Sequence, residues 1–156
     1  SAAKDMVART CSWSDMNTGS WNIDGLNAFS GVLADAFSEL DADIRLQEAP
    51  GFDTIDSSGN IQTIHTAPIL RASARMAAPV QIVLTGHYDT VFPKGTFEGV
   101  TDLGDGRFNG PGLADMKGGL CVMLEALKAF EAGPFRDRLG YQIVITPDAT
   151  TPAPRH

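Results

Sequence analysis

Two stretches of the chain, residues 81–92 and 107–119, constrain its fold more than any other part of the sequence. The first is an apolar run that ends in His87-Tyr-Asp89, and the second is a glycine-rich loop that carries Asp115 just before an expected helix. A strand, a loop and a helix in this order begin a βαβ unit, in which strand ends and helix starts meet at the C-terminal edge of the sheet. We therefore expect the side chains of His87 and Asp115 to converge there, with Asp89 behind His87.

The spacing of apolar residues along the rest of the chain predicts an alternation of helices and strands. The expected helices are residues 3–16, 24–40 and 120–130, and the expected strands are 42–48, 61–70, 80–85 and 141–146. The run 80–85 is apolar without alternation, which is typical of a strand covered on both faces. Residues 93–112 are expected to form a long loop with a small hairpin near Asp105-Gly106. Together these elements predict an α/β fold with three layers, in which a mainly parallel sheet has helices on both faces.

Length, charge and cysteine content narrow the class of protein. The 156 residues fit one domain, and the net charge of −7 argues against a nucleic-acid partner, which needs basic patches. No segment reaches the ~18 apolar residues of a membrane span, so no membrane partner is expected. Cys11 and Cys121 are too few for a disulfide framework and lack the spacing of metal ligands, and Cys121 lies on an apolar helical stripe. Two unpaired cysteines fit a reducing compartment, so we expect a cytoplasmic protein, although a cleaved leader is compatible with the sequence.

His87, Asp89 and Asp115 are the residues that can carry chemistry. His87 and Asp89 are two positions apart at a strand end, so their side chains project on the same side. A carboxylate in this place accepts the second imidazole N–H and makes the ring a better metal ligand. Each residue also has a structural interpretation, because a single histidine is more often structural and an aspartate before a helix is often its N-cap. Four glycines flank Asp115 and allow a closer backbone approach than a cap requires: Gly110, Gly112, Gly118 and Gly119.

The resemblance to a known family lies in His87-Tyr-Asp89-Thr-Val-Phe-Pro and in Gly110-Pro-Gly-Leu-Ala-Asp115-Met-Lys-Gly-Gly. Together these motifs resemble the zinc exopeptidase superfamily of glutamate carboxypeptidases, acetylornithine deacetylases, succinyl-diaminopimelate desuccinylases and aminoacylases. The Thr-Val-Phe-Pro variant is most similar to the bacterial glutamate carboxypeptidase branch. Matches to the same branch also occur at Asn17-Thr-Gly-Ser20, Asp24-Gly-Leu and Val144-Ile-Thr-Pro-Asp148. The resemblance covers residues 1–148 and implies the N-terminal segment of a metallopeptidase catalytic domain, without the lid or dimerisation domain of the family.

The resemblance implies a role for each candidate residue. His87 would ligate one of two zinc ions, Asp115 would bridge both ions, and Asp89 would be the catalytic residue that orients His87. The peptide bond after Asp115 would be cis. The family hydrolyses a peptide or N-acyl amide bond next to a free carboxylate, with zinc polarising the carbonyl and activating a water. The expected substrate is therefore a small peptide or an N-acyl amino acid.

The sequence departs from the family after Asp148. The family places a general base and a zinc ligand there, both glutamates, whereas this chain has Ala149 and Thr150, which can play neither role. We expect residues 149–156 to form an irregular tail in which His156 replaces no ligand. We also expect weak or absent metal binding, no activity of this chain alone, and self-association through exposed apolar surface. Whether the chain is a truncation, a frameshifted product or a piece of a longer enzyme stays open.

A non-catalytic α/β binding domain, which keeps the scaffold without a complete metal site, is the alternative function. A flavodoxin-like nucleotide-binding domain is a weaker alternative, because neither glycine-rich phosphate fingerprint is present in the sequence. Zinc content and activity against an N-acyl glutamate separate the enzyme from the binding domain.

Overall fold

The computed structural model describes residues 2–49 and 51–148. Two helices come first, α1 (Ala2–Asp15) and α2 (Ile23–Phe37). Five strands follow: β1 (Asp43–Gln47), β2 (Phe52–Ile55), β3 (Ile61–Ile64), β4 (Ile69–Ala74) and β5 (Val80–His87). The remaining elements are β6 (Thr101–Gly104), β7 (Arg107–Asn109), the wide helical turn η1 (Leu113–Lys117), α3 (Gly118–Glu131), the short turn η2 (Arg136–Arg138) and β8 (Leu139–Thr146).

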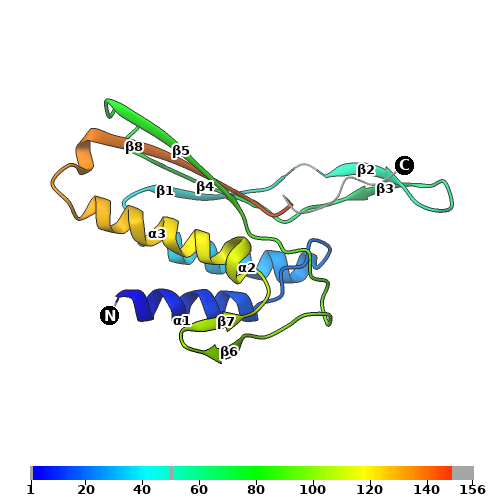
Figure 1. Ribbon diagram of the computed structural model, residues 1–156. Coiled ribbons are helices and arrows are strands. Elements are labelled where there is room, and N and C mark those ends of the chain that lie inside the picture. The colour runs from blue at the N-terminus through cyan, green and yellow to red at the C-terminus, as the bar shows by residue number, and fades with distance from the viewer. Residues whose placement is uncertain (1, 50, 149–156) are drawn as a thin grey trace.

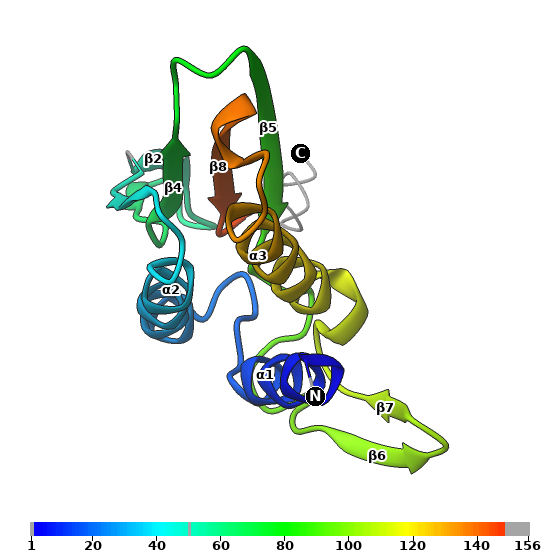
Figure 2. The same ribbon diagram turned by 90° about the vertical axis from the view of Figure 1, so that its left-hand side faces the viewer.

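A four-stranded sheet in the order β1-β4-β8-β5 forms one layer, and the helices pack beneath it (Figure 1). The view along the helices shows α2 and α3 next to the sheet and α1 on their far side (Figure 2). The pairs β2-β3 and β6-β7 are separate two-stranded hairpins. The β6-β7 hairpin turns at Asp105-Gly106, as the sequence predicts.

The α/β class is confirmed, but the strand directions differ from the expected mainly parallel sheet. Only β5 and β8, which α3 connects, pair in parallel, whereas β1 with β4 and β4 with β8 pair antiparallel. The chain passes from β4 to β5 through residues 75–79, a connection too short for the crossover that parallel strands need. The expected strand at 61–70 is in fact two strands, β3 and β4, separated by a break that contains Pro68, which lacks a ladder N–H.

Two expectations are wrong: the sheet does not have helices on both faces, and β5 is not covered on both faces. In the described part of the chain, α1, α2 and α3 all lie on one side of the sheet (Figures 1 and 2). Ile82 and Leu84 pack against the core on that side, while Val83 on the other side is 63% exposed. A continuous apolar run therefore does not require cover on both faces here, because alternate residues still separate into a packed set and an exposed set.

The core lies between the sheet and the helices. Its fully or nearly fully buried members come from α2, α3 and the two central strands: Leu26, Phe29, Leu33, Phe37, Leu120, Leu124, Leu127, Leu70, Tyr141, Ile143 and Ile145. Each such side chain contributes about 1.5–3 kcal/mol relative to exposure. Cys121 is buried among them, as its helical stripe predicts, and both cysteines are free thiols. None of the described helices is both long and apolar enough to cross a bilayer.

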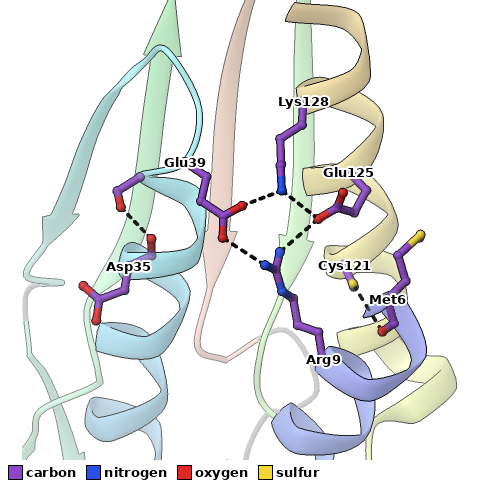
Figure 3. A network of polar contacts seen from close by, with 8 residues as sticks. Met6, Arg9, Asp35, Glu39, Cys121, Glu125 and Lys128 are labelled. Carbon is purple, nitrogen blue, oxygen red and sulfur yellow. Dashed lines mark hydrogen bonds and ion pairs between the residues drawn. The ribbon is translucent and has the colours of Figure 1, made fainter. Parts of the chain in front are cut away.

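Charged side chains from α1, from α3 and from the residues just after α2 form a network of ion pairs (Figure 3). Arg9 of α1 contacts Glu39, just after α2, at 2.9 Å and Glu125 of α3 at 3.0 Å. Lys128 of α3 contacts the same two carboxylates at 2.5 and 3.1 Å. These groups are partly exposed, so each pair contributes only about 0–1 kcal/mol.

Candidate metal site

β5 brings His87 and Asp89 to the edge of the sheet through its pairing with β8. His87 lies opposite Thr146 in the parallel register, and the backbone N–H of Tyr88 donates to Thr146 O at 3.0 Å. Tyr88 is fully buried, and its hydroxyl donates to Pro68 O at 2.6 Å. Burial raises the pKa of the Tyr88 hydroxyl, which keeps it a donor. Because side chains alternate along an extended backbone, fixing Tyr88 on one side places His87 and Asp89 together on the other.

The imidazole of His87 lies between two carboxylates. Its Nδ1 is 3.2 Å from Asp89 Oδ1, and its Nε2 is 3.0 Å from Asp115 Oδ1. Asp89 has no exposed surface, the side chain of His87 is 13% exposed, and that of Asp115 is 78% exposed. The predicted convergence of His87 and Asp115, with Asp89 behind the ring, is therefore present in the structure.

The glycine-rich loop can reach the strand end because Gly112 of the loop and Gly86 of β5 have no side chain. Gly112 has φ +71°, and a Cβ there would stand 2.9 Å from the Thr90 methyl group. A Cβ on Gly86 of β5 would stand 2.8 Å from a Leu120 methyl group, so α3 starts in close contact with the strand. The peptide bond from Asp115 to Met116 is cis, as the resemblance implies.

Asp115 does not cap α3. The cap position of α3 is Lys117, and no side chain makes a capping hydrogen bond there. Asp115 has φ −132° and ψ 95°, outside the helical region, and its carboxylate contacts His87 instead. The N-cap interpretation is therefore wrong for this residue.

No pattern in the sequence singles out Lys117. Its side chain is completely buried, and Nζ donates to Trp13 O at 2.8 Å and to Met16 O at 2.7 Å. Nζ also lies 4.6 Å from the centre of the Phe29 ring. Burial lowers the pKa of Lys117 to about 7. The side chain bonds carbonyls at the C-terminal end of α1, so it ties the loop that carries Asp115 to α1.

The chemistry of His87 and Asp115 fits a divalent cation. Zinc binds imidazole nitrogen and carboxylate oxygen at about 2.0–2.2 Å, so two such atoms 3.0 Å apart can share one ion. A neutral ring that donates Nδ1–H to Asp89 presents the Nε2 lone pair to the Asp115 carboxylate. Two lone pairs face each other favourably only when a cation or a proton lies between them. Within residues 2–49 and 51–148, no third His, Cys, Asp or Glu joins this pair, and Ala149, Thr150 and His156 lie outside the described residues.

A cavity of about 330 Å³ adjoins Asp115 on the side of the long loop. Thr90, Asn109 and the aromatic rings of Phe92 and Phe97 line it, and the two ring centres are 4.9 Å apart. Its volume lies near the lower end of the range for small-molecule sites. The candidate metal site therefore opens onto a space that a small ligand can occupy.

Residues 83–148 match the model of peptidase family M20/M25/M40. This part of the chain is similar to that peptidase family. The match begins within β5 and includes His87, Asp89 and Asp115. A search of curated protein sequences found no match.

Several solved structures share the fold. Human carnosine dipeptidase 1 superposes with a TM-score of 0.70 at 17% identity, over 91% of this chain and 31% of that one. The M20 family metallo-carboxypeptidase Sso-CP2 from Sulfolobus solfataricus has a TM-score of 0.64 at 13% identity, over 91% and 30% of the two chains. A Zn-dependent exopeptidase from Parabacteroides distasonis has a TM-score of 0.61 at 17% identity, over 92% and 45%. The chain thus spans between about a third and a half of the length of these proteins.

Proposed function

We propose that residues 1–148 form the N-terminal segment of a zinc exopeptidase catalytic domain of the glutamate carboxypeptidase type. His87 and Asp115 are its metal ligands, and Asp89 is the catalytic residue that acts on His87. The observation that carries the proposal is the arrangement of His87, whose Nε2 lies 3.0 Å from Asp115 while Nδ1 lies 3.2 Å from a buried carboxylate. The family match and the metallo-carboxypeptidase and Zn-dependent exopeptidase among the similar structures support zinc as the ion and hydrolysis as the reaction.

The protein groups have separate tasks in this proposal. Bound zinc supplies Lewis-acid polarisation of an amide carbonyl and an activated water. His87 binds through Nε2, and Asp89 accepts a hydrogen bond from Nδ1–H, which keeps the ring in one tautomer and raises its basicity. Asp115 supplies a carboxylate at the exposed side of the site. The cavity beside Asp115 is where we place a small peptide or an N-acyl amino acid, as the dipeptidase among the similar structures suggests.

Zinc titration of the 156-residue chain, followed through the imidazole signals of His87 in NMR spectra, tests the proposal. We expect a dissociation constant above about 1 μM, weaker than −8 kcal/mol, because catalytic zinc normally has three protein ligands and only two are described here. Asp115→Asn should abolish the response. The controls His65→Ala and Asp105→Asn change an exposed histidine and an exposed aspartate and should leave it unchanged.

The alternative is a non-catalytic α/β binding domain that keeps this scaffold. The specific observation in its favour is the pair of candidate ligands without a third in the described residues. A chain that shows no zinc response at His87 up to millimolar concentration would favour the binding domain and contradict the proposed metal site.

A further inference from the structure

The strand β5 lies at one edge of the four-stranded sheet, and β8 is its single neighbour among the described strands. We propose that this edge is an interface for a second copy of the chain, in which the two β5 strands pair antiparallel around Val83. A two-fold axis at that residue would join the two sheets into one continuous sheet. The inference concerns the edge of the sheet and is independent of the proposed function.

Alternate backbone groups of β5 point away from β8. The N–H of Tyr88 donates to β8, at Thr146 O, whereas the N–H of His87 points outward and contacts Met116 Sδ at 3.4 Å. Since backbone groups alternate in direction along a strand, every second residue before His87 also presents its N–H and C=O outward. These residues are Gln81, Val83 and Thr85. In the described part of the chain no strand pairs with this row, so it is open to another strand.

The side chains of β5 are self-complementary around Val83. With Val83 opposite Val83 of the second copy, Ile82 lies opposite Leu84 and Gln81 lies opposite Thr85. Ile82 and Leu84 pack against the core on the helix side, so their pairing would extend the core across the axis. Centring the axis on either neighbouring residue would instead place the apolar Val83 opposite a polar side chain. A two-fold interface needs this self-complementarity, because each contact in it occurs twice.

The same register also suits the backbone. Facing residues whose backbone groups point toward each other exchange both hydrogen bonds in an antiparallel pair. The pair of Val83 with its own copy and the pairs of Gln81 with Thr85 are of this kind, so the outward groups of all three residues would gain partners. The helix-side pair of Ile82 with Leu84 is then of the closer, non-hydrogen-bonded kind, which favours contact between apolar side chains.

The distribution of charge favours a second copy at β5 and disfavours one at the other edge strand, β1. Val80–Gly86 contains no charged residue and no proline, so two copies of a chain with net charge −7 can meet there without opposing charges. In contrast, β1 carries an exposed ion pair between Asp43 and Arg45, and exposed charges on an edge strand discourage pairing. A single pair of strands is a small interface, below the roughly 1,200 Å² of stable complexes, so we expect a dissociation constant of about 10–100 μM.

Sedimentation velocity of the 156-residue chain, at concentrations below and above this range, tests for the dimer. Val83→Lys places two ammonium groups opposite each other at the axis and should weaken the dimer by about tenfold or more. Val83→Thr keeps a branched side chain and should retain it. The matched control is Val122→Lys on α3, because Val122 is 56% exposed and Val83 is 63% exposed. Circular dichroism verifies that each variant is folded.

Disulfide cross-linking tests the register. Facing Cα atoms of a hydrogen-bonded antiparallel pair lie about 5.5 Å apart, within the roughly 4.4–6.8 Å that a disulfide spans. The partly exposed Cys11 is first replaced by serine, and Cys121 stays because it is buried. In this background Val83→Cys should form a covalent dimer under mild oxidation. Thr85→Cys should not, because each Thr85 lies opposite Gln81 in the proposed register.

Hydrogen exchange identifies what covers the edge. The amides of Gln81, Val83 and Thr85 should exchange more slowly as the concentration of the chain rises, because only the dimer protects them. A chain that stays monomeric at every concentration overturns the inference. Protection of these amides in the monomer also overturns it, because another segment of the chain then covers the edge. Any association that Val83→Lys leaves intact, or a covalent dimer of Thr85→Cys without one of Val83→Cys, contradicts the interface as proposed.

Discussion

Replacing Lys117 by methionine should destabilise the protein, although it removes a buried charge. The substitution keeps a long unbranched side chain, so it creates little cavity, but it removes the donors to Trp13 O and Met16 O. Each carbonyl left without a partner costs about 1–3 kcal/mol. Loss of the contact between the ammonium and the Phe29 ring adds about 1–2 kcal/mol. Burial of the ammonium carries a desolvation cost, which also lowers the pKa of Lys117, and methionine removes that cost. The free energy of unfolding should therefore fall by about 2–4 kcal/mol, less than the sum of the two losses.

Thermal unfolding followed by circular dichroism measures the effect. For a domain of this size, 1 kcal/mol corresponds to about 2–4 °C, so Lys117→Met should melt roughly 5–15 °C below the wild type. Lys94→Met changes an exposed lysine of the long loop and should melt with the wild type. Hydrogen exchange should also become faster at the Lys117 amide, which donates to Gly112 O at 2.8 Å in the turn that Lys117 ties to α1. A Lys117→Met chain that melts within 2 °C of the wild type would refute the reasoning, since the two carbonyls would then be satisfied without the ammonium.

Three further predictions concern the loop, the helix network and the reaction. Gly112→Ala should lower the free energy of unfolding by about 1–3 kcal/mol, because its φ is positive and the added Cβ would contact Thr90. The control Gly59→Ala, where the added Cβ meets no neighbour, should lower it by only about 1 kcal/mol. Urea titration measures both values. A hydrogen bond from Lys128 lowers the pKa of Glu39, so the stabilisation from Glu39 is complete above its ordinary pKa of 4.5 and is lost as pH falls below it. The stability difference between wild type and Glu39→Gln, about 1 kcal/mol or less at pH 7, should therefore shrink as pH falls below 4.5, and an unchanged difference would contradict the ion pair. The 156-residue chain with zinc should not hydrolyse an N-acyl glutamate at an enzymatic rate, because general-base catalysis alone contributes about 10²–10⁴-fold and Ala149-Thr150 offers no base; zinc-dependent turnover that His87→Ala abolishes would show this expectation to be wrong.

The candidate site could be predicted from the sequence because its geometry follows from local rules. His87 and Asp89 share one side of an extended backbone, and a βαβ connection brings the loop with Asp115 back to the same edge. The roles of these residues as metal ligands and catalytic group stay predictions. The apolar spacing was also enough to find α1, α2 and α3 within a few residues.

Other features depend on contacts between distant segments, which no local pattern encodes. The direction of β4 follows from the short connection at 75–79, and an apolar run alone does not reveal whether its strand has helices on one face or on both. In the sequence, Lys117 looks like an ordinary polar residue at the start of a helix. Its burial depends on the carbonyls at the end of α1, to which its ammonium donates. The contact of Ser20 with Asp89 likewise depends on the packing of the segment between α1 and α2 against β5.

These distant contacts support the candidate site from two sides. The ring of His87 is held on one side by Asp89 and Ser20, and the loop of Asp115 is held by Lys117 on the end of α1. Both supports consist of protein groups, and both involve residues at the end of α1 or in the segment between α1 and α2. A small zinc domain folds only when the metal supplies the energy. Here the hydrophobic core and the main-chain contacts to Thr90 supply it, so under the proposed function the fold of this segment would not depend on the cation.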